Sequence, residues 1–207
     1  MTARPLVSVI TGTWQRHDLL MEAIQNVREQ IYPHLEHVIV SDGPDERLRD
    51  LVAYVSMQRP DVPIRFVELG RNLSTFVPDS FGAAPVLTGQ MLARGEYQTW
   101  LADDERMAPD HIEGLVAACE ESGADFAYSQ CRMWWVGRPD HSWIIGTDPP
   151  QCGQITNTLH RATILKHGLY PFGAGMTSDW TLYETWIKAG ARWAFVPRVT
   201  FSHRADH

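Results

Sequence analysis

The first 120 residues alternate between short apolar segments and longer segments with helical periodicity. The short segments are rich in Val and Ile and predict buried strands, whereas the longer ones carry one apolar stripe and predict helices. Such an order implies right-handed crossovers between parallel strands, with helices on both faces of one sheet. We therefore expect an α/β fold with a mostly parallel central sheet. The expected strands are 6–11, 37–41, 64–68 and 97–102, and the expected helices are 18–32, 45–57, 80–94 and 110–121.

The pattern changes after this alternation. A strand is predicted at 125–129, and a β-hairpin at 132–136 and 142–145, across residues 137–140. A short helix over 161–167, a glycine-containing loop over 170–176 and a helix over 178–189 precede two strands at 193–196 and 199–202. Because no linker or repeat divides the chain, we expect a single domain, 1–207.

Composition excludes several functional classes. The 207 residues carry a formal net charge of -7 and include three cysteines without paired metal spacing. This charge argues against a broad nucleic-acid or anionic-membrane surface, and no apolar run has membrane-spanning length. We interpret the cysteines as reduced thiols and expect a cytoplasmic protein. An anionic substrate would then need a metal ion or a few well-placed cations.

Three adjacent carboxylates, Asp103, Asp104 and Glu105, follow the fourth predicted strand and precede a helix that begins near Pro109. Ligands of open α/β sheets bind outside the carboxyl ends of the strands. Acidic oxygens at such an edge suit a hard divalent cation, which can hold a diphosphate. The alternative is a solvated turn with acids that favour the first helical turn.

The turn after the first strand contains Gly12, Thr13 and Trp14, and the second strand ends at Asp42. This is not the three-glycine dinucleotide motif. Trp14 offers a flat π-face for a base, and Asp42 can accept a hydrogen bond from a base N–H. A partly buried core aromatic and a turn-forming aspartate are the alternatives.

Two late residues complete the candidate set. His203 follows the last strand and can supply an imidazole beside carboxylate oxygens. Asp179 begins a helix and can either point into a cleft or act as an N-cap. Taken alone, a surface histidine and a capping aspartate are the more common interpretations.

Together these segments resemble family 2 glycosyltransferases, which have the GT-A fold. The resemblance implies a nucleotide-sugar-binding half, 1–110, and an acceptor-binding and catalytic half, 111–207, with a small C-terminal acceptor subdomain. Five segments in the family's order carry it: Val7–Arg16, Val38–Gly43, Ala93–Asp110, Ser178–Leu182 and Phe201–His203.

The resemblance also assigns roles to residues. Asp104 takes the metal-binding place with His203, Asp103 takes the ribose or sugar place, and Asp179 takes the place of the catalytic base. In place of the family's Asp-x-Asp motif this chain has Ala102-Asp103-Asp104-Glu105, so one of the usual aspartates is absent. The family's arginine before the fourth strand is also absent, and Arg71 is a substitute.

The function implied is that of an inverting, metal-dependent glycosyltransferase using Mn²⁺ or Mg²⁺. It would move a sugar from a nucleotide donor, with UDP favoured by the resemblance, to a carbohydrate or other hydroxyl-bearing acceptor. The Asp179 pKa should not be high, because a helix N-terminus favours the charged carboxylate; Glu105 and Glu184 are the alternative bases. The rival functions are a non-catalytic sugar-nucleotide binding module and a sugar-phosphate nucleotidyltransferase.

Three tryptophans of the predicted hairpin, Trp134, Trp135 and Trp143, have no role in this assignment. Aromatic faces suit sugar rings, so these residues are candidates for an acceptor platform. They are equally candidates for core packing or for the interface of a homodimer.

Overall fold

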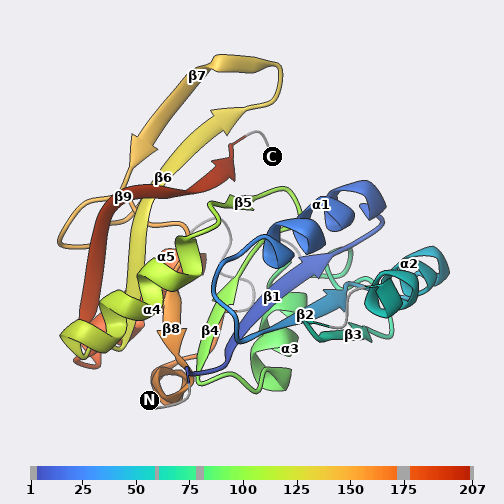
Figure 1. Cartoon of the computed structure of the whole chain (residues 1–207), viewed down its shortest axis with the longest axis horizontal. Coiled ribbons are helices and arrows are strands. Elements are labelled where there is room, and N and C mark those ends of the chain that lie inside the picture. The colour runs from blue at the N-terminus through green and yellow to red at the C-terminus, as the bar shows by residue number, and fades with distance from the viewer. Residues whose placement is uncertain (1–3, 59–60, 78–81, 172–177, 206–207) are drawn as a thin grey trace.

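The computed structural model describes residues 4–58, 61–77, 82–171 and 178–205. Its described part contains one large sheet with helices on both faces (Figure 1). The strands are β1 Val7–Thr13, β2 Leu35–Ser41, β3 Ile64–Glu68, β4 Tyr97–Trp100, β5 Arg106–Met107, β6 Phe126–Trp135, β7 Arg138–Ile145, β8 Leu159–Arg161 and β9 Trp193–Arg204. The helices are α1 His17–Arg28, α2 Glu46–Gln58, α3 Ala83–Leu92, α4 His111–Ser122, η1 Ala162–His167 and α5 Ser178–Lys188.

The strand order is β3-β2-β1-β4-β8-β6-β9-β5, and β7 pairs with β6. The four N-terminal strands β3, β2, β1 and β4 are parallel, as the alternating sequence predicts. Beyond β4 the sheet is mixed: β8 is antiparallel to both β4 and β6, and β6 is parallel to β9. The α/β class is therefore confirmed, with four neighbouring parallel strands in the first half and one parallel pair, β6 with β9, in the second.

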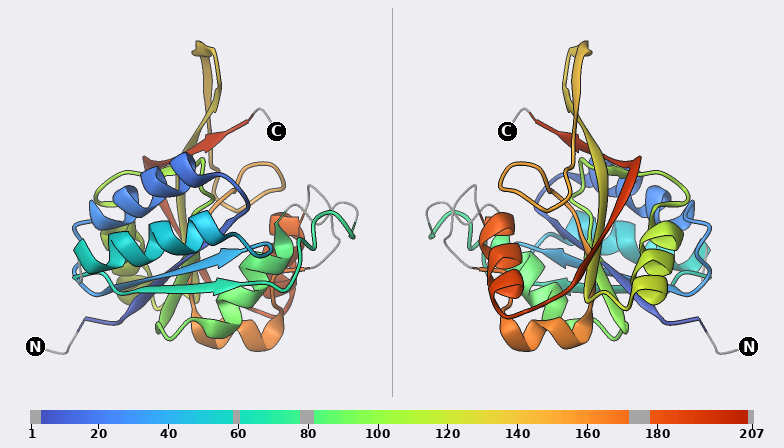
Figure 2. Two further views of the ribbon diagram at one scale, coloured as in Figure 1. Left: turned by 90° about the vertical axis from the view of Figure 1, so that its right-hand side faces the viewer. Right: turned by 90° about the vertical axis from the view of Figure 1, so that its left-hand side faces the viewer.

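Alternation along β1 shows how the sheet separates two cores. Val7 and Val9 face a cluster that includes residues of α1 and α4, whereas Ile10 faces a cluster that includes residues of α5. A third cluster joins α1 and α2 over Ile39 of β2. Helices α1, α2 and α4 thus cover one face, and α3 and α5 cover the other (Figure 2). Both faces are buried, which explains the continuous apolar composition of the strands.

Five elements differ from the sequence-based expectation. β5 and β8 were not predicted, because segments of two and three residues have no readable periodicity. β6 and β9 are single long strands where shorter ones were expected, and β-bulges interrupt the register of their pairing. The short helix over 162–167 is a 3-10 helix. The expected start of α3 at Ser80 lies outside the described residues.

Candidate active site

The three carboxylates of the acidic turn lie between β4 and β5, and all are buried. Asp103, Asp104 and Glu105 are 2%, 4% and 5% exposed. A solvated turn would leave these carboxylates in water, so the alternative interpretation is wrong. Buried carboxylates need compensating partners. Their partners come from three other segments of the chain.

Arg16 bridges the two aspartates from the turn after β1. Its Nη1 lies 2.8 Å from Oδ1 of Asp103 and its Nη2 lies 2.6 Å from Oδ2 of Asp104. Thr13 donates a hydrogen bond of 2.8 Å to Oδ2 of Asp103. The preceding residue, Gln15, has φ of 55°, a strained conformation for a side chain with a Cβ. This turn directs the guanidinium back over the acidic turn.

Burial and the neighbouring charges shift the pKa values of Asp103 and Arg16. Burial raises the pKa of Asp103 to about 6, with smaller opposing contributions from Thr13 and Arg16. Burial alone would lower the pKa of Arg16, but the hydrogen bond from Arg16 to Asp104 and both aspartate charges outweigh it and raise that pKa. The guanidinium therefore supplies the positive charge that keeps two neighbouring carboxylates in one buried turn.

Glu105 pairs with His203, whereas the two aspartates pair with Arg16. Nδ1 of His203 donates to Oε1 of Glu105 at 2.5 Å, while Oε2 of Glu105 accepts the N–H of Ala102 at 2.9 Å. Burial lowers the pKa of His203, but Glu105, Asp179 and Asp104 together raise it above its ordinary value. The pairing of β5 with β9 explains the meeting, because Arg106 is in register with Ser202.

Asp179 approaches the same group from α5. The hydroxyl of Tyr170 donates to its Oδ1 at 2.5 Å. Burial raises the pKa of Asp179 to about 6; Glu105 raises it further, and Tyr170 and His203 oppose the shift. The expectation of a low pKa was therefore wrong, because desolvation outweighs the helix N-terminus here. α5 begins at Ser178, so Asp179 lies within the first turn and not before it.

The predicted metal ligands Asp104 and His203 lie in one charged cluster, since the charge of Asp104 acts on the pKa of His203. The described residues contain no group of three or more His, Cys, Asp or Glu side chains around a common point. The prediction requires only two protein ligands. The donor set fits a divalent cation: Glu105 holds the Nδ1–H of His203, as carboxylates commonly do behind a metal-bound imidazole. Arg16 already demonstrates that a cation is accommodated beside Asp104.

Asp42 follows β2, beside the end of β1, where its N–H donates to the carbonyl oxygen of Thr13. Its Oδ1 accepts the N–H of Leu73 at 2.8 Å, and its Oδ2 accepts the N–H and hydroxyl of Ser74 at 3.1 and 2.5 Å. Asp42 thus anchors the loop after β3 and is buried at 3% exposure. Base recognition by Asp42 stays a prediction, and any base N–H would share oxygens that the loop already uses.

Trp14 packs over the residue that follows Asp42. A Cβ on Gly43 would lie 2.6 Å from Cζ3 of Trp14 and 2.9 Å from the nitrogen of Asn72, and Gly43 has φ of 135°. Only glycine suits this close approach and this backbone conformation. The half-buried indole and Asp42 are therefore neighbours, which is the arrangement that base binding requires.

Two further predicted contacts have structural explanations. A Cβ on Gly12 would meet Cβ of Pro85 at 2.9 Å, so Gly12 allows α3 to pack closely on β1. The guanidinium of Arg71 lies 5.5 Å from the ring centre of Phe76, and both side chains are exposed. Contact of either residue with a nucleotide stays a prediction.

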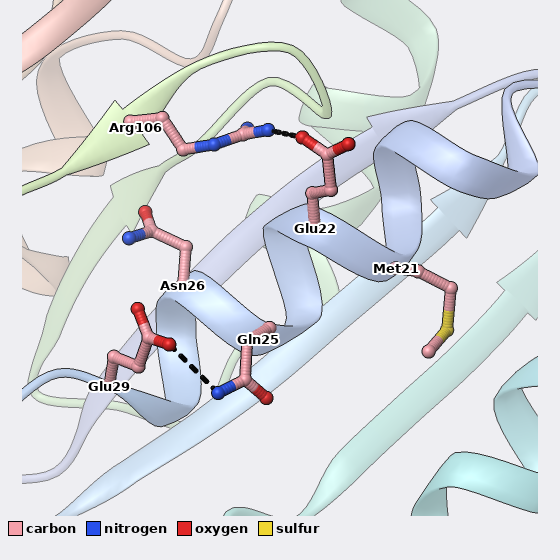
Figure 3. A pocket seen from close by; sticks show the side chains of 6 residues that line it. All are labelled: Met21, Glu22, Gln25, Asn26, Glu29 and Arg106. Atoms are coloured by element: carbon pink, nitrogen blue, oxygen red, sulfur yellow. Dashed lines mark hydrogen bonds and ion pairs between the residues drawn. The ribbon is translucent and has the colours of Figure 1, made fainter.

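A groove of about 360 Å³ lies elsewhere, along the outer surface of α1 (Figure 3). Glu22 points toward Arg106 of β5, and the two form an ion pair. Glu29 accepts a hydrogen bond from Gln25 at 2.9 Å. None of the predicted site residues lines this groove, so we assign the candidate site to the acidic turn.

Sequence reasoning missed the interactions that assemble the site. It gave no role to Arg16 or Tyr170, and it considered Glu105 only as a substitute base. The contacts of Arg16 with Asp104 and of Glu105 with His203 join residues far apart in the chain, whereas Tyr170 and Asp179 are nine residues apart. The available signal was position: Arg16 directly follows the turn that contains Thr13 and Trp14, at the same sheet edge as the acids.

Comparison with known proteins agrees with this architecture. The sequence model for glycosyl transferase family 2 matches residues 8–134. The chain belongs to this family of nucleotide-sugar-dependent enzymes. An uncharacterized glycosyltransferase of Rickettsia typhi is 26% identical over 205 residues, covering 90% of this chain and 59% of that protein.

Solved structures confirm the GT-A fold. A mannosyltransferase from Pyrobaculum calidifontis in complex with GDP-Man and Mn²⁺ superposes with a TM-score of 0.73 and 20% identity, covering 98% of this chain and 57% of that one. S. aureus TarS 1-349 in complex with UDP-GlcNAc gives a TM-score of 0.71 and 16% identity, over 98% of this chain and 59% of that one.

The chain spans about half the length of the curated relatives it matches, 46% of one from Bacillus subtilis and 59% of the Rickettsia protein. Among the described residues, no helix is both long enough and apolar enough to cross a membrane.

Proposed function

We propose that this protein is an inverting glycosyltransferase that depends on Mn²⁺ or Mg²⁺ and uses a UDP-linked sugar. The observation that carries the proposal is the pairing of His203 with Glu105 from segments far apart in sequence, with Asp104 and Asp179 near enough for their charges to act on the pKa of His203. A carbohydrate or other hydroxyl-bearing compound is the acceptor.

The loops after β1, β2 and β3 bind the donor. Trp14 stacks on the base beside Asp42, while Thr13 and Arg16 hold Asp103 in the orientation in which it contacts the ribose or sugar. Asp104 and His203 would hold the metal ion, which when bound offsets negative charge on the diphosphate. Solved relatives of this fold bind GDP-Man with Mn²⁺ and UDP-GlcNAc, which supports a nucleotide-sugar donor and leaves the base open.

Asp179 is the general base. With its pKa raised to about 6, its carboxylate is mostly ionised at neutral pH and is a stronger proton acceptor than an ordinary aspartate. Tyr170 fixes its orientation through the hydrogen bond to Oδ1. The acceptor hydroxyl would lose its proton to Asp179 as its oxygen bonds to the anomeric carbon, opposite the departing diphosphate. Glu184 is a weaker alternative, because it pairs with Lys188 at 3.0 Å and is 45% exposed.

Asp179 also favours an enzyme over a non-catalytic binding module. A carboxylate beside Glu105 with a raised pKa is costly to maintain in a protein that only binds its ligand. A nucleotidyltransferase would need a glycine-rich, basic loop after β1, whereas the turn here has one glycine and one arginine.

Thermal-shift measurements with UDP, GDP and CDP, each with and without Mn²⁺, test the donor assignment. We expect UDP with Mn²⁺ to raise the melting temperature most, because ligands stabilise the state that binds them. Asp104→Ala should fold and lose the metal-dependent part of that shift. A native-like shift in this variant would contradict the metal assignment, and a larger shift with GDP would contradict the uridine assignment. Metal-dependent hydrolysis of a UDP-sugar separates an enzyme from a binding module.

A further inference from the structure

The β6–β7 hairpin rises from the body of the molecule beside the end of β9 (Figures 1 and 2). A two-residue turn, Val136-Gly137, joins its strands, and Gly137 has a positive φ of 73°, which glycine adopts readily. The hairpin is anchored at its base, where Cys131 and Ile145 are paired and buried at 3% and 7% exposure. Its outer part carries large apolar side chains that the core does not need.

One face of the hairpin is a continuous apolar strip. Met133 lies outward from Cys131, with their sulfur atoms 3.8 Å apart, and is paired with Trp143. The ring of Trp143 lies 6.2 Å from the ring of Trp135, centre to centre. Trp135 and Trp143 are 40% and 43% exposed. We call Met133, Trp135 and Trp143 the tryptophan strip.

The tryptophan strip begins beside the candidate active site. Met133 is in parallel register with His203, and the next inward pair, Cys131 and Phe201, is buried in one cluster. Paired residues of adjacent strands share a face, so His203 and the strip lie on the same face of the sheet. Trp143 is two strands from His203, which corresponds to about 10 Å. This spacing places the ring of Trp143 two strands away from the candidate metal ligand His203.

We propose that the tryptophan strip binds the acceptor and that the acceptor is a carbohydrate chain, an inference that rests on the proposed function. A sugar ring has a face of C–H groups and a rim of hydroxyls. The C–H face packs against the negative π-face of an indole, while the hydroxyls stay in water. A half-exposed strip that begins beside His203 suits the sugar units next to the reacting hydroxyl.

The charges of the hairpin argue against a lipid bilayer as the occupant. Its outer end carries Arg138, Asp140 and His141, all exposed and of mixed sign. A carboxylate at the leading end would oppose insertion between lipids. Trp143 lies on the side of the hairpin, level with His203, and not at its end.

The test is binding of the labelled protein to an array of immobilised oligosaccharides, with UDP and Mn²⁺ present. We expect Trp143→Leu to weaken binding to the recognised glycans by ~10-fold or more, as truncation of a central tryptophan does at binding sites. Trp143→Tyr retains an aromatic face and should retain most of the binding. Tyr54→Leu is the matched control, since Tyr54 is a 58% exposed aromatic on α2.

Other outcomes overturn the inference. Absence of glycan binding, or equal binding by Trp143→Leu and the parent, removes the carbohydrate acceptor from the strip. If the parent sediments with phosphatidylglycerol vesicles and Trp143→Leu still does so, the strip is a membrane surface. If the protein forms a dimer that only variants of the strip lose, the strip binds a second copy of the chain. Metal-dependent hydrolysis of a UDP-sugar by the parent protein tests the proposed function separately. Its absence in the parent would contradict the proposed function, whereas its presence without strip-dependent glycan binding contradicts only this inference.

Discussion

The proposed nucleotide end of the site, at Asp42, and its proposed catalytic end, at Asp179, differ in how their carboxylates are held. Asp42 receives three hydrogen bonds, all from Leu73 and Ser74 of one loop. Among the described residues, Tyr170 donates one hydrogen bond to Asp179, and the negative charge of Glu105 acts on it. The first arrangement satisfies a carboxylate and fixes a loop. The second leaves a carboxylate under-compensated, with its pKa raised to about 6.

This difference separates a carboxylate that stabilises the structure from one that can accept a proton. A carboxylate with several N–H and O–H donors is a stable anchor, because hydrogen bonds favour its charged form. A desolvated carboxylate beside another acid holds a proton more tightly and can take one from a substrate. We therefore expect changes at the nucleotide end to alter binding and folding, and changes at the catalytic end to alter rate.

The largest expected effect is on the rate of Asp179→Asn. The amide can still accept the hydrogen bond of Tyr170, so the variant should fold and bind the sugar nucleotide with Mn²⁺. Its transfer rate should fall by at least ~100-fold, the low end of general-base contributions. Single-turnover transfer measurements at saturating donor check this prediction.

Asp18→Asn is the matched control for that variant. Asp18 is the second residue of α1, as Asp179 is of α5, and it is exposed. Both substitutions remove one negative charge from a first helical turn, but only one lies in the site. Near-native transfer by Asp179→Asn would assign the base to another residue, with Glu105 the next candidate.

The sequence could predict that the turns after β1 and β2 meet better than it could predict the pairing of Glu105 with His203, and the reason is local. β1 and β2 each end in a turn whose residues, Trp14 and Asp42, are visible in a short window, and parallel strands bring those turns together. The Glu105–His203 pair depends on β5, two residues long, in register with β9. No periodicity marks such a strand. The raised pKa of Asp179 likewise depends on burial between elements that are not adjacent in sequence.

The second largest effect is expected from Asp42→Ala. This change leaves the N–H groups of Leu73 and Ser74 without their acceptor and should lower the free energy of unfolding by roughly 1–3 kcal/mol. UDP affinity should fall, while the transfer rate at saturating donor should stay within a factor of about 3, far above the ~100-fold loss expected for a missing base. Urea unfolding and calorimetry with UDP measure the two effects. A large loss of rate at saturating donor would remove the distinction between the two ends.

A smaller effect is expected from Arg16→Gln, which tests the residue that joins the turn after β1 to the acidic turn. Arg16 is 40% exposed and pairs with both aspartates of the acidic turn. Removing this cation should let Mn²⁺ bind ~2–5-fold more tightly, because exposed ion pairs contribute up to about 1 kcal/mol. Calorimetry with Mn²⁺ alone measures the change. Weaker Mn²⁺ binding by the variant would show that Arg16 supports the metal site and does not compete with it.

The smallest effect is a change in how stability depends on pH, and its sign distinguishes a base from a helix-capping residue. The folded pKa of Asp179 is about 6, above its ordinary value of 3.8. The proton-bound carboxyl therefore contributes stability that is fully present below about pH 4 and is lost as pH rises through about 6. Asp179→Asn lacks this titration, so its melting temperature should rise relative to the parent over that interval, by a few degrees Celsius, and stay higher at neutral pH.

A capping aspartate would have a lowered pKa, and the melting temperature of its Asn variant would fall relative to the parent as pH rises. Melting curves of the parent, Asp179→Asn and Asp18→Asn between pH 4 and 8 decide the question. A falling difference for Asp179→Asn would show that its carboxylate is stabilised in the charged form and is a weak base.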